Sequence, residues 1–369
     1  MTDATGPLAG LVVADFSRVL AGPYATMMLG DMGADVIKIE RPGTGDDTRS
    51  WGPPYDSAGT ATYFNSVNRN KTSRCIDLQS ERGVAEARRI VAGADIVIEN
   101  FRAGTMDRLG LGYSAVAQDN PGLIYCSITG FGTGGGAALP GYDLVVQAVG
   151  GLMSVTGPDA STPTKVGVAM VDIVTGLHAL SGILAALHHR SNTGEGQQVH
   201  TSLMASVLSA LSNQSAAYLG AGVVPVPMGN KHPSLVPYEV FETADRPLAL
   251  AVGNDRQFQA LVDVLGAPDV AADQRFSSNS ARVEHRDELV DILNSTLQTR
   301  TADDWYRELM ARNVPAGPVN SIEEAFAFAQ SLGLEPRIEV PGAAAEGVRN
   351  PVDFSATPVN YRLPPPPAG

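Results

Sequence analysis

The sequence is poor in cysteine, in aromatic residues and in positive charge. Its 369 residues include two cysteines, Cys75 and Cys126, and each lies alone in a strand-like apolar run. Isolated cysteines argue against a disulfide framework and are typical of a reducing compartment. The net charge of −13 argues against a nucleic-acid partner or an anionic membrane surface. We therefore expect a globular, cytoplasmic protein.

Targeting signals and long apolar runs are lacking as well. No uninterrupted apolar stretch approaches the roughly 20 residues that a membrane-spanning helix needs. The first ten residues contain neither a basic nor an apolar segment, so we expect no signal peptide and no membrane segment. His188 and His189 are adjacent and would point about 100° apart on a helix, so they do not form a metal pair. We expect no metal site.

Charge is distributed unevenly along the chain. Residues 1–110 contain 12 Lys and Arg against 14 Asp and Glu, whereas the remainder contains 14 against 25. The N-terminal third therefore has the cations to bind a polyanion, although chance alone can produce such a distribution.

The first half alternates strand-like and helix-like segments. Helices are predicted to open at Pro23, which suits a first helical turn, and to cover 82–94. Strands are predicted at 11–17, 34–40, 95–100 and 122–131. This alternation indicates an α/β fold with a doubly wound parallel sheet.

The second half indicates a separate, smaller domain. We predict a large domain over 1–219 that ends in a helix over 202–219, a linker at 220–234 and a small α+β domain at 235–320. The segment 321–369 is expected to return to the large domain, and its proline-rich tail, residues 350–369, to pack as an extended strap. The sequence GFGTGG (130–135) matches a dinucleotide-binding pattern, but the Pro140 region that follows argues against the helix that such a site requires.

One carboxylate interrupts a long apolar segment, KVGVAMVDIVTGLHALSGILAAL (165–187). Asp172 there fits two roles equally well, as the cap of the helix and as a nucleophile toward an acyl group, and the two roles can coexist. A helix N-terminus in apolar surroundings is expected to keep the carboxylate ionised yet poorly hydrated. Gly176, one turn later, would leave room for a substrate to approach.

Several segments resemble class III CoA-transferases, the family of the formyl-CoA and carnitine enzymes with the α-methylacyl-CoA racemases as a branch. The segments are RVLAGPYATMMLGDMGADVIKIERPGTGDDTRSWGPP (18–54), NRNKTS (68–73), ENFRAGTMDRLGLGY (99–113), GYDLVVQAVGGLMSVTG (141–157), DIVTG (172–176) and TGEGQQV (193–199). The likeness is greatest to succinyl-CoA:glutarate-type dicarboxylate transferases. It implies a Rossmann-like large domain, a smaller α+β domain and an interlocked homodimer.

The resemblance also implies a mechanism. Asp172 would form an anhydride with the donor acyl group, and CoA would then be held on it as a thioester before transfer to a carboxylic acid acceptor. No tightly bound cofactor is expected, because coenzyme A enters as the acyl-CoA substrate.

The same resemblance assigns side chains to the CoA cleft: Val19, Arg41, Leu78, Asn100, Phe101 and Arg108. Lys71 and Arg102 are candidate phosphate partners by charge alone. Each cation has the alternative of being a solvated surface residue.

Two features of the pattern bear on the substrate. The racemase branch carries a histidine where this chain has Tyr142, and a tyrosine is a poor proton carrier near neutral pH. This favours the transferase, with a racemase as the alternative and a CoA-binding relative without chemistry as a third reading. Leu20 stands where formyl-type enzymes carry a glutamine, which argues against formate or oxalate.

A dicarboxylate substrate needs a cation for its distal end. The candidates are Arg18, Arg49 and His232, each of which could instead form a structural ion pair. Formyl-type enzymes also have a glycine run over the active site, whereas this chain has the single Gly253, so a different lid is expected.

Overall fold

The computed structural model describes residues 5–367. The chain divides into two compact units, and each is described by itself. The large unit comprises the described residues up to 153, then 165–225 and 335 onward, and the small unit comprises 154–164 and 226–334. The return to the large unit thus begins at 335 instead of the predicted 321. The reason is that helix α15 (Ile322–Ser331) stays with the small unit, where Phe328 packs edge-on against Tyr306.

The large unit is built on a six-stranded sheet in the order β3-β2-β1-β4-β5-β6. All neighbouring strands are parallel. The strands are β1 (Val12–Asp15), β2 (Asp35–Glu40), β3 (Lys71–Cys75), β4 (Ile96–Glu99), β5 (Ile124–Thr129) and β6 (Gln198–Ser202). This confirms the expected doubly wound α/β sheet, whose strand order reverses between β1 and β4.

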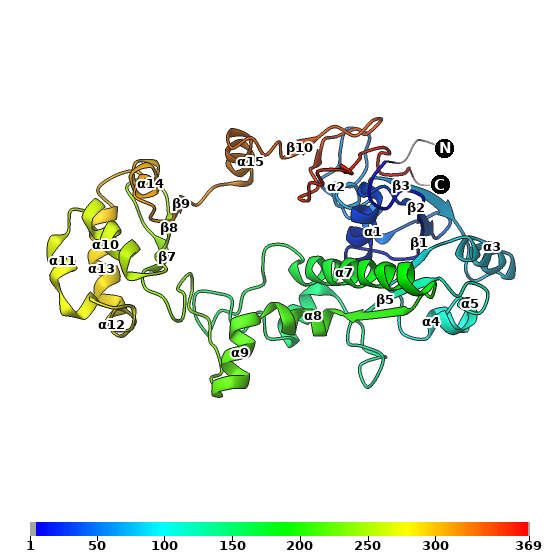
Figure 1. Ribbon diagram of the computed structural model, residues 1–369, viewed down its shortest axis with the longest axis horizontal. Coiled ribbons are helices and arrows are strands. Elements are labelled where there is room, and N and C mark those ends of the chain that lie inside the picture. The colour runs from blue at the N-terminus through cyan, green and yellow to red at the C-terminus, as the bar shows by residue number, and fades with distance from the viewer. Residues whose placement is uncertain (1–4, 368–369) are drawn as a thin grey trace. The chain divides into compact units, whose positions relative to one another are not determined.

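Alternating side chains in the strands supply a core on each face of this sheet. In β5, Ile124, Cys126 and Ile128 face one core, and Tyr125 between them faces the other. Helices α1 (Ala21–Asp31) and α7 (Met170–Thr193) cover the first face. Helices α3 (Glu81–Ala92), α4 (Thr105–Arg108) and α5 (Tyr113–Val116) cover the second. Figure 1 shows α1 and α3 on opposite sides of the sheet.

Shorter elements complete the large unit. They are η1 (Asp47–Ser50), α2 (Thr62–Asn65), α6 (Asp143–Val149), α8 (Leu203–Ala210), α9 (Ser212–Ala221), β10 (Arg337–Ile338) and β11 (Gly347–Val348). The predicted helix over 202–219 starts as expected, with Ser202 as the N-cap of α8, but it is not continuous. It breaks at Ser212, whose φ of 42° lies outside the right-handed helical region. The polar edge strand β6, which precedes it, was not predicted.

The C-terminal strap has no helix or strand between residue 349 and residue 367. It is held to the large unit by backbone hydrogen bonds, from the Asn70 amide to the Leu363 carbonyl (2.9 Å) and from the Asn360 amide to the Asp31 carbonyl (2.8 Å). These contacts confirm the predicted extended packing of the tail.

By length and composition, α7 is apolar enough to cross a membrane, even though Asp172 and several histidines interrupt its apolar run. The core helix of a globular domain passes the same test, and α7 packs as one. Seven of its residues are buried, and its apolar side chains contact α1 and the sheet.

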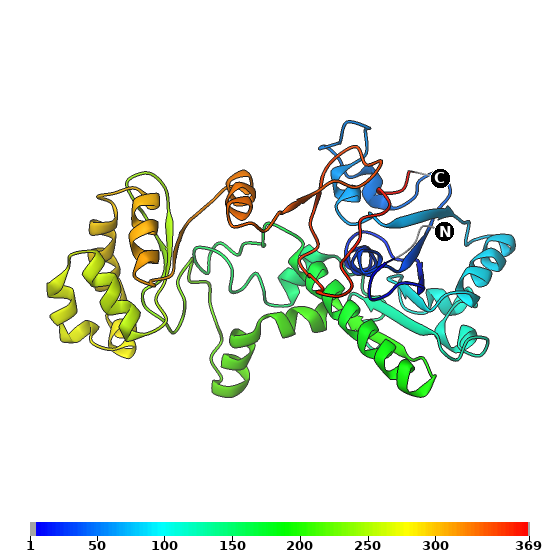
Figure 2. The same cartoon turned by 45° about the horizontal axis from the view of Figure 1, so that its top comes forward.

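The small unit has an antiparallel sheet of β7 (Tyr238–Phe241), β8 (Leu248–Ala251) and β9 (Ala316–Pro318). Besides α15, its helices are α10 (Asp255–Val264), α11 (Pro268–Ala272), η2 (Gln274–Phe276), α12 (Asn279–Glu284), α13 (Arg286–Leu297) and α14 (Ala302–Ala311). Figures 1 and 2 show α10, α11 and α13 on one side of the strands. Their apolar faces form one core around residues such as Leu261, Leu293 and Trp305.

Candidate active site

Asp172 is the third residue of α7 and is half-buried. Its predicted role as the helix N-cap is wrong, because the N-cap position belongs to Ala169. The cap is supplied by Asp143 at the start of α6, whose Oδ2 accepts hydrogen bonds from the Val171 amide (2.8 Å) and the Asp172 amide (3.1 Å). The carboxyl group of Asp172 is therefore left for other use.

The environment of Asp172 favours its protonated form. Burial, followed by the nearby charge of Asp143, raises the pKa of Asp172 to about 7. The expectation that the helix N-terminus keeps this carboxylate fully ionised is therefore corrected: desolvation and a like charge outweigh the helix dipole. The result is a carboxyl group that gains and loses its proton near neutral pH.

The sequence suggested that Gly176 leaves room for a substrate to approach, and the structure corrects this expectation. A Cβ atom at this position would lie 2.6 Å from the carbonyl oxygen of Ala21. The glycine instead lets α7 approach the first turn of α1 closely.

Asp172 lines a cavity of about 290 Å³ within the large unit. The cavity lies where β1, β4 and β5 end and where α1 and α7 begin. The predicted site residues on its wall are Arg18, Val19, Asn100, Phe101, Arg102, Tyr142 and Asp172. The carboxyl ends of parallel strands are where ligands bind in such sheets.

A second, larger cavity of about 610 Å³ lies along the carboxyl ends of β1 to β4. Four predicted residues line it: Arg18, Arg41, Leu78 and Phe101. Arg18 and Phe101 belong to both cavities, and the Arg18 guanidinium stacks 4.9 Å from the centre of the Phe101 ring. These two side chains thus connect the larger cavity with Asp172.

The cations of the larger cavity differ in their partners. Arg41 pairs with Asp47 at the surface. Arg18 forms no ion pair within residues 5–367, and burial, followed by the positive charge of Arg41, lowers its pKa. Arg18 is therefore free to meet an anionic ligand at the junction of the two cavities.

Two predicted contacts are corrected by the structure. The Lys71 ammonium is fully buried, bonded to the Pro23 carbonyl at 2.9 Å and paired with Asp15, so it is a structural cation and not a phosphate partner. Arg49 forms a two-pronged ion pair with Glu40, at 2.7 and 2.9 Å. The structural alternative therefore holds for Arg49.

Arg108 and His232 lie outside both cavities. Arg108 is exposed at the end of α4 and donates to the Thr105 hydroxyl (3.0 Å), while Thr105 itself lines the larger cavity. His232 and Gly253 belong to the small unit, where the His232 ring accepts from the Ser234 amide (3.0 Å).

Sequence reasoning missed two residues near Asp172. Asp143 was passed over as a cap, because 29 residues separate it from its partner and no local spacing signals the contact. Tyr63, on α2, is half-buried, and its pKa is raised to about 12 by burial and then by the charges of Asp172 and Asp143. Within residues 5–367, no three His, Cys, Asp or Glu side chains gather as a metal site would require.

Comparison with known proteins agrees with this geometry. The chain is 46% identical to the succinate–glutarate CoA-transferase of Agrobacterium fabrum, with 100% of this chain and 94% of that protein covered. It is 40% identical to the human succinyl-CoA:glutarate CoA-transferase, with 98% and 83% covered. The crystal structure of a CAIB/BAIF family protein from Brucella suis matches with a TM-score of 0.88 at 42% identity, covering 98% of this chain and 96% of that one.

A family model described as CoA-transferase family III matches residues 8–369. With the parallel sheet, the cavity at its carboxyl edge and a carboxylate inside that cavity, the chain belongs to CoA-transferase family III.

Proposed function

We propose that this enzyme transfers CoA from succinyl-CoA to a second carboxylic acid, a dicarboxylate, by covalent catalysis on Asp172. The observation that carries the proposal is the position of Asp172 in a cavity that shares Arg18 and Phe101 with the larger cavity at the sheet edge. The names of the relatives supply the choice of succinyl-CoA as donor.

In the first half-reaction, the ionised Asp172 carboxylate attacks the thioester carbonyl, and the C–S bond breaks to give an aspartyl–succinyl anhydride and CoA thiolate. The thiolate then attacks the Asp172 carbonyl, which releases succinate and leaves CoA on Asp172 as a thioester. The acceptor carboxylate displaces CoA to form a second anhydride. Attack of the thiolate on the acceptor's acyl carbon gives the new acyl-CoA and restores the Asp172 carboxylate.

The two cavities divide the acyl-CoA substrate between them. In this proposal the larger cavity holds the nucleotide part, with Arg41 near a phosphate group and Leu78 as an apolar wall, and no separate cofactor is bound. Asn100, Phe101 and Val19 line the passage to Asp172, and Arg102 lies at its rim. Arg18 is the remaining candidate for the distal carboxylate of the acyl group, since Arg49 is occupied by Glu40.

The proposal predicts that the enzyme exchanges label between free succinate and succinyl-CoA without any other acceptor. Asp172→Ala should abolish the exchange, while Asp119→Ala, a matched change at an exposed residue of the large unit, should leave it intact. Mass spectrometry of enzyme mixed with succinyl-CoA should detect CoA bound through Asp172. A folded wild type that binds CoA but exchanges no label would exclude succinate as a substrate.

A racemase is the second candidate, because that branch shares the fold. Tyr142 on the wall of the Asp172 cavity disfavours it. Deuterium uptake from solvent at the α-carbon of a 2-methylacyl-CoA would identify a racemase. Binding of CoA without exchange or deuterium uptake would identify a relative that has lost its chemistry.

The proposal includes a cytoplasmic, interlocked homodimer. Exposed apolar side chains on and around α6 and α9 of the large unit are consistent with coverage by a second copy: Leu144, Val145, Val149, Tyr218 and Leu219. Light scattering during gel filtration should give twice the chain mass, and cell fractionation should recover the protein in the cytoplasmic fraction.

A further inference from the structure

The turn at residues 17–20, between β1 and α1, forms the wall between the two cavities. Arg18 lines both of them, and Val19 and Leu20 line the Asp172 cavity. Any movement of this turn therefore changes the nucleotide cavity and the acyl cavity together.

This turn has an unfavourable backbone conformation. Val19 has a φ of 67°, a left-handed value that β-branched residues rarely adopt. Such conformations persist only where the surroundings impose them, and they gather at functional sites. Asn100 holds the neighbouring residue through both of its amide atoms, accepting from the Arg18 amide (2.9 Å) and donating to the Arg18 carbonyl (2.8 Å).

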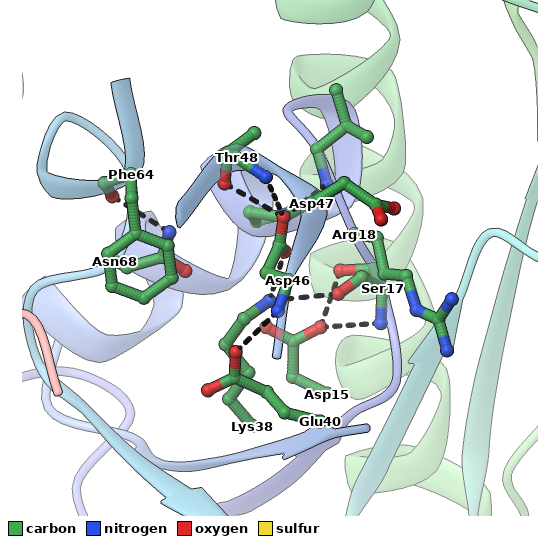
Figure 3. Close-up of polar contacts among 12 residues, drawn as sticks. Asp15, Ser17, Arg18, Lys38, Glu40, Asp46, Asp47, Thr48, Phe64 and Asn68 are labelled. Carbon is green, nitrogen blue, oxygen red and sulfur yellow. Dashed lines mark hydrogen bonds and ion pairs between the residues drawn. The ribbon is translucent and has the colours of Figure 1, made fainter. Parts of the chain in front are cut away.

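The other side of the turn is held by a buried lysine. Lys38, on β2, is fully buried; its ammonium donates to the Ser17 carbonyl (2.9 Å) and pairs with Asp46 (2.8 Å), as Figure 3 shows. Asp46 in turn accepts from the Val19 amide (3.4 Å) and from the amide of Thr48 (3.0 Å). Lys38 thus holds the peptide groups on both sides of Arg18, including the amide that enters the strained Val19.

A buried ion pair of this kind is weak evidence for stability, because removing both charges from water costs about as much as their attraction returns. Lys38 contacts Ser17 directly and Val19 through Asp46, and these contacts indicate a role in ordering the turn. We propose that Lys38 is a positioning residue, whose buried ammonium fixes Val19 in its left-handed conformation and so keeps the CoA cavity aligned with Asp172. The link to catalysis rests on the proposed transfer reaction.

The test compares Lys38→Met with Arg69→Met. Arg69 is also a buried cation of the large unit, but it pairs with Asp31, away from the turn. Lys38→Met should lower kcat for label exchange by on the order of 100-fold, the usual cost of misplaced reacting groups. Its affinity for CoA should fall less than about tenfold, since Arg41 and Leu78 are unchanged. Arg69→Met should lower thermal stability and leave kcat within about twofold.

Two further measurements separate positioning from general damage. Hydrogen–deuterium exchange of the peptide 16–22 should become faster in Lys38→Met and not in Arg69→Met. Adding Val19→Gly to Lys38→Met should recover part of the lost kcat, because glycine adopts the left-handed conformation without support. A loss of folding alone would not be rescued in this way.

Each outcome decides the proposal. A folded Lys38→Met enzyme with unchanged kcat and unchanged exchange at 16–22 would overturn it. If Lys38→Met does not fold, Asp46→Asn keeps the shape of the pair, removes its charge balance and is judged by the same criteria. If the wild type does not use succinyl-CoA, the proposed function fails, and hydrogen exchange at 16–22 then decides the role of Lys38 independently.

Discussion

The large and small units differ in where they keep their ion pairs. The large unit has exposed pairs such as Arg88–Asp119, but its Lys38–Asp46 and Lys71–Asp15 pairs are fully buried. In the small unit, Arg300–Glu308 and most other pairs are half-exposed, with Arg286–Glu239 as a buried exception. Because burying charge is expensive, the comparison indicates that the large unit uses ion pairs to order a site, whereas the small unit depends on its apolar core.

Connections among the buried pairs support this interpretation. Asp15 accepts from the Ser17 amide (2.9 Å), and Glu40, the partner of Arg49, accepts from the Asp46 amide (2.8 Å). Lys38–Asp46 and Lys71–Asp15 therefore contact the turn that separates the two cavities, and Arg49–Glu40 is linked to it through Asp46. The fourth, Arg69–Asp31, instead lies beside the C-terminal strap, where Asn350 also donates to Asp31 (3.0 Å).

The largest expected effect is at Asp172, whose buried charge should serve activity at the expense of stability. Asp172→Asn should abolish label exchange. Because the folded-state pKa is raised from 3.8 to about 7, the stabilisation from the bound proton is full below the unfolded pKa and is lost as pH rises through 7. Relative to the variant, the wild type should therefore lose up to about 4 kcal/mol of unfolding free energy between pH 4 and pH 8.

Denaturant unfolding of both proteins across this pH range checks that prediction. The surface variant Asp119→Asn is the control for removing one carboxyl group of the large unit. A constant difference between Asp172→Asn and the wild type would mean that the carboxyl group is not desolvated as the structure indicates.

A buried pair remote from the turn should affect stability alone. Arg69→Met leaves Asp31 buried without its charge partner, which typically costs about 3–5 kcal/mol. Thermal and denaturant unfolding measure the loss, and label exchange below the melting temperature should remain close to the wild-type rate. A fall in the kcat of Arg69→Met without a loss of stability would contradict the distinction between pairs that order the site and pairs that only stabilise the fold.

After burial, the charge of Asp143 should contribute to the pH dependence of transfer. Since only the carboxylate form of Asp172 attacks, kcat/KM should rise with pH through about 7. Asp143→Asn removes a like charge but keeps an oxygen to cap α7, so the midpoint of the profile should move to lower pH. The exchange rate measured from pH 5 to pH 9 tests this, and an unmoved midpoint would contradict the assigned cause.

The smallest effect is expected in the small unit. Arg300→Ala removes a half-exposed pair with Glu308, and such pairs contribute about 0–1 kcal/mol. Leu293→Ala, a truncation in the apolar core of the same unit, should lower the free energy of unfolding by about 2–5 kcal/mol. Unfolding of the two variants side by side would show whether the core or the surface pairs stabilise this unit.

Much of the fold could be predicted from local patterns. The apolar strands and Pro23 indicated the parallel sheet and α1, because a fully buried strand must be apolar on both faces. The polar edge strand β6 was missed for the same reason, since an edge strand lacks that signature. The break at Ser212 was also missed, because the local sequence kept the pattern of a continuous helix.

For the site, the residue types were easier to predict than their surroundings. The motifs singled out Asp172, Arg18 and Phe101, and the structure brings them together. Lys71 and Arg49 were misjudged because charge alone does not reveal burial or a partner. Asp143 escaped notice because its contact with α7 joins distant parts of the chain.

The sequence by itself determined the strand–helix order, the family and the carboxylate at the start of α7, because these depend on local periodicity and on motifs. Only the tertiary structure decided which charges are buried, which are free and how each is paired. Burial and pairing depend on segments brought together from β1, β2, β4 and α6, and they set the protonation of Asp172 and the conformation of Val19.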